Sequence, residues 1–88
     1  MKVVKFYADW CGPCKSYQEH WDEVQNENDD SSIEFISVNI EEPGGAKYKR
    51  NLEITSIPLT VIFNEELEPQ REHKGLLKPE QLKEFING

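Results

Sequence analysis

Cysteine, histidine and long apolar stretches are all scarce in this sequence. Its 88 residues include two cysteines, two histidines and one methionine. The cysteines are three positions apart and would close too small a loop to restrain the unfolded chain much, so a purely structural disulfide is not expected. No apolar run approaches the roughly 20 residues that a membrane-spanning helix needs. These absences exclude a disulfide framework and a transmembrane segment.

Basic residues are also in short supply. Lys and Arg total 10 against 17 Asp and Glu, which gives a net charge of -7. Such acidity repels nucleic acid and anionic membrane surfaces. The length suits one domain, residues 1–88, and not two. Only Met1 and Lys2 precede the first apolar run, which is too short for the core of a signal peptide, so we expect a cytoplasmic protein.

The apolar pattern alternates between strand and helix. A β-branched and aromatic run at 3–8 predicts a buried strand. From Cys14 the apolar residues recur at steps of three and four, which predicts a helix opened by Pro13. A strand at 33–40 follows, so the first two strands should be parallel and joined by a right-handed crossover. The remaining pattern predicts a helix at 46–52, a strand at 59–63, a charged edge strand at 67–74 and a helix from Pro79 onward.

Both cysteines lie in the loop Cys11-Gly12-Pro13-Cys14, between the first strand and the first helix. A C-x-x-C at such a junction is typical of a dithiol redox site. The reactive form of a thiol is the thiolate, which the N-terminus of a helix favours at Cys11, with Cys14 one turn further on. We expect Gly12 to allow the tight approach and Pro13 to stiffen the loop. A metal site is not expected, because His20 and His73 stand in no recognisable ligand spacing to the pair.

The string W-C-G-P-C-K, within residues 6–15, closely resembles the active-site segment of thioredoxins. The resemblance continues downstream and covers nearly the whole chain, apart from the family's N-terminal strand and helix. The chain therefore has the motif of a thioredoxin and the length of a glutaredoxin. The matching downstream segments are 38–41, 56–58, 61–63, 74–76 and 82–86.

This resemblance implies an α/β thioredoxin-like fold. It would contain a four-stranded mixed sheet of order 2-1-3-4 with three flanking helices. Pro58 matches the family's cis-proline, which faces the two cysteines and holds an extended substrate through the backbone of the preceding residue. The resemblance also implies a shallow apolar groove around Cys11, formed by Trp10, Ile40, Ile57, Pro58, Gly75 and Leu76.

The function implied is that of a thiol–disulfide oxidoreductase acting on protein disulfides. Cys11 would attack the target, and Cys14 would resolve the mixed disulfide. We expect a monomer without metal or organic cofactor, reduced by a thioredoxin reductase or by glutathione. A glutaredoxin-like enzyme is the nearest alternative, although Gly12-Pro13 replaces the usual Pro-Tyr pair. Another is a binding subunit of a larger enzyme, docking through the basic cluster Lys47, Lys49 and Arg50.

Three positions depart from the thioredoxin pattern. Lys5 stands where the family typically has a buried acid behind the second cysteine, Ser37 replaces the lysine that usually pairs with that acid, and Glu19 replaces a helix-kinking proline. A cation near Cys14 favours thiolate, so Lys5 predicts a more oxidising potential than that of an ordinary thioredoxin. Alternatively, Lys5 reaches solvent without effect, or it is buried, neutral and able to act as a base.

Overall fold

The computed structural model describes all 88 residues and contains four strands and three helices. Their order is strand, helix, strand, helix, two strands and helix, as the sequence predicts. The bounds are β1 Lys2–Tyr7, α1 Gly12–Glu27, β2 Glu34–Asn39, α2 Pro43–Asn51, β3 Leu59–Phe63, β4 Pro69–Lys74 and α3 Pro79–Asn87. No helix combines the length and apolar character that a membrane crossing requires.

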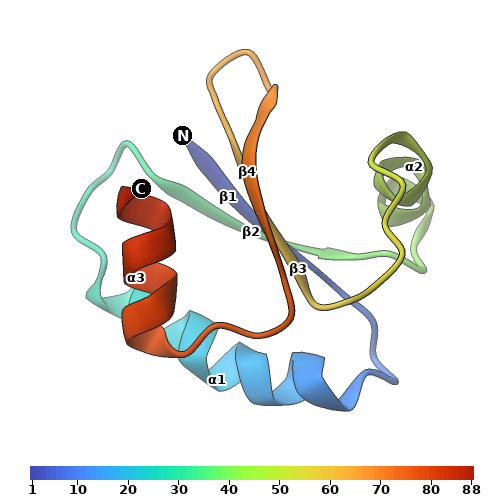
Figure 1. Cartoon of the computed structure of the whole chain (residues 1–88), viewed down its shortest axis with the longest axis horizontal. Helices are drawn as coiled ribbons and strands as arrows, with labels where there is room; N and C mark the ends of the chain where they lie inside the picture. The colour runs from blue at the N-terminus through green and yellow to red at the C-terminus, as the bar shows by residue number, and fades with distance from the viewer.

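The strands form one mixed sheet of order β2-β1-β3-β4. β1 and β2 are parallel, whereas β3 is antiparallel to both β1 and β4. This arrangement confirms the predicted topology, including the charged edge strand β4. Because β1 lies inside the sheet, the loop that follows it is placed at one end of the sheet, next to the start of α1 (Figure 1).

The sheet buries a separate apolar cluster on each face. One cluster joins Val3 of β1 to Trp21 of α1 and Leu82 of α3. The other contains Val4 and Phe6 of β1. Side chains alternate along a strand, so consecutive residues of β1 serve opposite faces. Figure 1 shows the result: α1 and α3 lie together on one side, and α2 stands apart from them.

Helix α2 and strand β4 begin elsewhere than the sequence predicts. α2 starts at Pro43 rather than at residue 46, although it then includes two glycines. A Cβ on Gly45 would lie 1.8 Å from the carbonyl oxygen of Asn39, so the helix can approach the end of β2 only with glycine there. β4 starts at Pro69 rather than at residue 67, because Leu67 adopts a φ of 62° in the preceding turn.

Candidate active site

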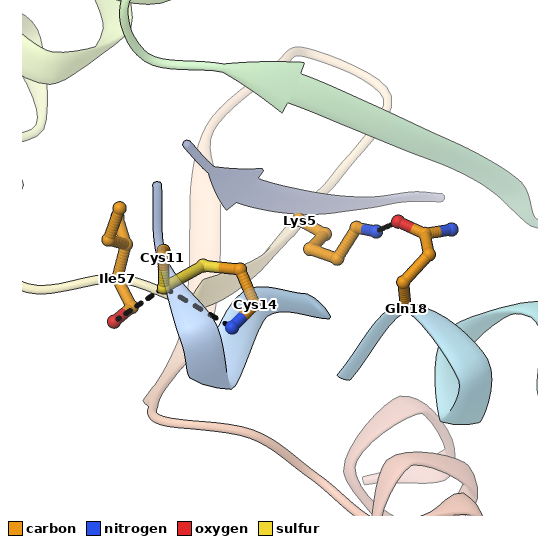
Figure 2. The surroundings of a disulfide bond; sticks show 5 residues. All are labelled: Lys5, Cys11, Cys14, Gln18 and Ile57. Carbon is orange, nitrogen blue, oxygen red and sulfur yellow. Dashed lines mark hydrogen bonds between the residues drawn. A yellow bond between two sulfur atoms is a disulfide. The ribbon is translucent and has the colours of Figure 1, made fainter. Parts of the chain in front are cut away.

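The loop of the two cysteines is fixed by the first turn of α1. Cys11 is the N-cap residue, and the backbone N–H of Cys14 donates a hydrogen bond to its Sγ at 3.2 Å. The two Cα atoms are 5.2 Å apart, and the two sulfurs form a disulfide (Figure 2). After reduction, an N–H donor in this position would favour a thiolate on Cys11. Cys11 thus lies at the N-terminus of α1 and Cys14 one turn further on, as the sequence predicts.

The segment before β3 lies directly against Cys11. The Cys11 Sγ is 3.8 Å from the carbonyl oxygen of Ile57, although 46 positions separate the two residues (Figure 2). The Ile57-Pro58 peptide bond is cis, as the resemblance implied. The backbone of residue 57 is thus placed beside the sulfur, where an extended chain could contact both.

A small pocket of about 100 Å³ adjoins this contact. It brings together three residues of the predicted groove, Trp10, Ile40 and Ile57. Trp10 is the most exposed large apolar side chain, at 67%. The rest of the lining, which was not predicted for the groove, is Lys49, Ile54, Thr55 and Ser56. The groove is therefore more polar than expected.

Gly75 and Leu76, which were also predicted for the groove, do not line this pocket. Gly75 donates a backbone hydrogen bond to the carbonyl oxygen of Pro58 at 2.8 Å and has a φ of +97°, which favours glycine. Leu76 is half-buried and packs against the cluster beneath α1 and α3. The structure thus places Gly75 next to the site and turns Leu76 toward the core, outside the pocket of Trp10.

Gly12 does not have the role that the sequence suggested. A Cβ added at this exposed position would meet no atom within 4 Å, so no close approach depends on glycine. The sharp change of direction comes instead from Cys11, which has the extended backbone of an N-cap. Pro13 lies within the first turn of α1, where its missing N–H costs no helical hydrogen bond.

Lys5 is fully buried, at 0% exposure, which rules out the alternative in which it reaches solvent. Its Nζ donates a hydrogen bond to Oε1 of Gln18 on α1, and Gln18 in turn donates to Asp22 at 2.7 Å. Figure 2 shows the lysine extending away from the disulfide, with its nitrogen directed at Gln18. The amine also lies 5.3 Å from the ring centroids of Tyr7 and Trp21.

Burial changes the protonation of this lysine. Desolvation lowers the pKa of Lys5 to about 8, against the smaller and opposite effect of the Asp22 carboxylate. No carboxylate forms an ion pair with Lys5, so amide and aromatic groups surround a cation that is still mostly protonated at pH 7. Ser37 is its register partner on β2 but is exposed, and Glu19 is exposed on α1.

Gln18 is the functional candidate that sequence reasoning missed. It lies one residue after the buried Tyr17 and is half-buried itself. With Cys14 and Tyr7 it lines a pocket of about 140 Å³, which is separate from the pocket of Trp10. A polar residue beside the apolar stripe of α1 was the available signal, but only the packing of α1 on β1 reveals its partner. No cluster of three or more His, Cys, Asp or Glu side chains is arranged to hold a metal ion.

Comparison with known proteins gives one consistent family. The family model described as Thioredoxin matches residues 1–88. The chain is 34% identical to the thioredoxin of Mycoplasmoides gallisepticum over 84 residues, which are 96% of this chain and 79% of that protein. It is 33% identical to the thioredoxin of Rickettsia typhi over 86 residues, which are 97% of this chain and 77% of that protein. The solution structure of oxidised thioredoxin from Plasmodium falciparum has a TM-score of 0.80 and 26% identity, covering 98% of this chain and 77% of that one.

These relatives extend beyond the matched region, and this chain corresponds to about four fifths of their length. Within it, the match includes the sheet, all three helices and the disulfide loop. The expectation drawn from the W-C-G-P-C-K string is therefore confirmed for both the fold and the chemistry. The chain belongs to the thioredoxin family, and its Cys11–Cys14 pair makes it a thiol–disulfide oxidoreductase.

Proposed function

We propose that this protein reduces disulfides of other proteins in the cytoplasm, as a monomer, with Cys11 as the attacking thiolate. The observation that carries the proposal is the position of Cys11 at the N-cap of α1, where the Cys14 N–H meets its sulfur. That N–H and the positive end of the helix dipole lower the free energy of a thiolate on Cys11. Cys14 lies one turn inside the helix, without an equivalent backbone donor to its sulfur.

The reaction proceeds in two exchanges. The Cys11 thiolate attacks one sulfur of the target disulfide, so the target S–S bond breaks, a mixed disulfide forms, and the other target sulfur leaves as a thiolate. The Cys14 thiolate then attacks the Cys11 sulfur, which closes the Cys11–Cys14 bond and releases the second target thiol. The target has gained two electrons, and the protein has lost two.

The pocket beside Cys11 supports the assignment of a polypeptide substrate. Trp10 and Ile57 offer an apolar contact surface, and the Ile57 carbonyl oxygen is placed beside the sulfur. A segment in extended conformation could hydrogen-bond to this backbone, as added strands do at exposed main chain. The proposal includes neither a cofactor nor a metal, because both exchanges use only the sulfur atoms.

A thioredoxin reductase is the proposed electron donor, and glutathione is the alternative. Reduction of insulin by the wild-type protein should be measured with NADPH and a thioredoxin reductase, and separately with glutathione, glutathione reductase and NADPH. We expect turnover with the first system and little with the second. Turnover only with glutathione would establish the glutaredoxin-like alternative, and no turnover with either would favour a binding subunit.

A further inference from the structure

The pocket beside Cys11 contains one charged side chain, Lys49 of α2. Lys49 is exposed and has no carboxylate within 4 Å. Lys47 and Arg50 on the same helix are equally exposed and unpaired. A protein with a net charge of -7 therefore has an uncompensated positive patch at the edge of its reactive site.

The acidic residues closest in sequence to this pocket do not neutralise it. Asp9 precedes Trp10, Glu41 follows Ile40 and Glu53 precedes Ile54, yet none of the three forms an ion pair with Lys49. Four of the seven lining residues are hydrophobic, and the hydroxyls of Thr55 and Ser56 add only neutral polarity. An anionic side chain that enters the pocket would thus meet a cation without displacing another carboxylate.

We propose that Lys49 makes the site selective for protein disulfides whose cysteine has an acidic residue within about two positions. This inference rests on the proposed function and specifies its substrate class. The Cys11 Sγ is 3.8 Å from the Ile57 carbonyl oxygen, and Ile57 lines the same pocket as Lys49. An extended chain advances roughly 3.3 Å per residue, so a substrate cysteine at Cys11 places its near neighbours in this pocket.

The net negative charge of the protein acts against this selectivity. An overall charge of -7 repels an acidic peptide at long range and attracts a basic one. A faster reaction with the acidic peptide would therefore have to come from the local cation. A solvent-exposed ion pair changes an affinity by roughly two- to five-fold, and it weakens as salt is added.

The experiment uses reduced protein and symmetrical disulfides of three synthetic peptides. Each peptide contains one cysteine. The residues two positions before and two positions after it are both Asp, both Asn or both Lys. The second-order rate of oxidation is measured in a single turnover by acid quenching, with one peptide disulfide yielding two peptide thiols and one Cys11–Cys14 bond. This readout needs no reductase. In wild type we expect the Asp peptide to react about three-fold faster than the Asn peptide at low salt.

Variants at two lysines separate the pocket from the general field. Lys49→Gln should abolish the preference for the Asp peptide, whereas the matched change Lys47→Gln, which alters the net charge equally but does not line the pocket, should retain it. Equal rates for all three peptides, a faster Lys peptide, or equal effects of both variants would overturn the inference. Failure of every peptide to react would instead overturn the proposed function itself.

Discussion

Replacing Lys5 with methionine tests the most unusual feature of the core. Lys5 is fully buried, and its amine is satisfied by Gln18 and by aromatic rings rather than by a carboxylate. Methionine has a similar length and adapts to irregular space, so it can fill the same volume without a charge. We expect Lys5→Met to be more stable than wild type at pH 7, because replacing a buried charge by an apolar group of similar size is often stabilising.

The magnitude follows from the pKa of Lys5, which falls from 10.5 to about 8 on folding. Below pH 8 the lysine is charged in both states, and the folded state is disfavoured by about 3 kcal/mol. Lys5→Met also loses the hydrogen bond to Gln18 and the cation–π contacts. Each loss offsets about 1 kcal/mol of the gain from removing the buried charge. Lys5→Met should therefore gain about 1 kcal/mol at pH 7.

The sign of this difference should depend on pH. Between pH 8 and 10.5 the unfolded chain binds a proton that the folded chain does not, so the stability of wild type rises with pH. By pH 9.5 wild type recovers about 2 kcal/mol, and Lys5→Met should become the less stable protein by about 1 kcal/mol. Measurements stop at pH 9.5 because Tyr17 begins to ionise near pH 10 in the unfolded chain, whereas burial raises its pKa to about 12 in the folded protein.

Urea denaturation of the oxidised proteins at pH 7 and pH 9.5 provides the measurement. Lys15→Met, at an exposed lysine on α1, makes the same chemical change without burial and should stay within about 0.5 kcal/mol of wild type. A Lys5→Met protein that is less stable at pH 7 would show that the ammonium is net stabilising. A difference that is the same at both pH values would show that the pKa of Lys5 is not lowered.

Three further changes test the site and its support. Lys5→Asp should make the redox potential more negative by on the order of 30 mV, because a carboxylate near Cys14 disfavours thiolate in the reduced form; a potential that is unchanged or more oxidising contradicts a tuning role for Lys5. Gly45→Ala should lower the free energy of unfolding by more than 2 kcal/mol, because its Cβ would meet the backbone of Asn39, and urea denaturation measures this. Gly44→Ala meets no atom and should instead be neutral or stabilising by up to about 1 kcal/mol, so equal effects of the two would contradict the close approach of α2.

The succession of strands and helices and the reactive loop could be predicted because both leave local signals, whereas the sheet order came from the family resemblance. A β-branched and aromatic run identified β1, and an apolar repeat of three and four identified α1. The cis bond before Pro58 and the position of Ile57 beside Cys11 came from family resemblance, because no local pattern places residues 46 positions apart in contact.

What the sequence did not predict depends on how elements pack. Gly44 and Gly45 fall outside the helix predicted at 46–52, yet they lie in α2, since Gly45 allows the helix to pack on the end of β2. Gln18 became the partner of Lys5 only when α1 packed on β1. The sequence shows that Lys49 is basic but not that it lines the pocket. Its place there depends on how α2 packs next to Trp10.

In the proposed mechanism Cys11 attacks the target disulfide and Cys14 resolves the mixed disulfide. Trapping of the mixed disulfide tests these two roles. Reduced Cys14→Ser and reduced Cys11→Ser are each mixed with insulin, quenched with acid and analysed by mass spectrometry without reductant. We expect a stable covalent adduct through Cys11 in Cys14→Ser, because no second thiol can release it. We expect little or no adduct in Cys11→Ser, whose remaining thiol lies inside the helix. Adducts formed at equal rates by both variants, or only by Cys11→Ser, would contradict the assignment of Cys11 as the attacking thiol.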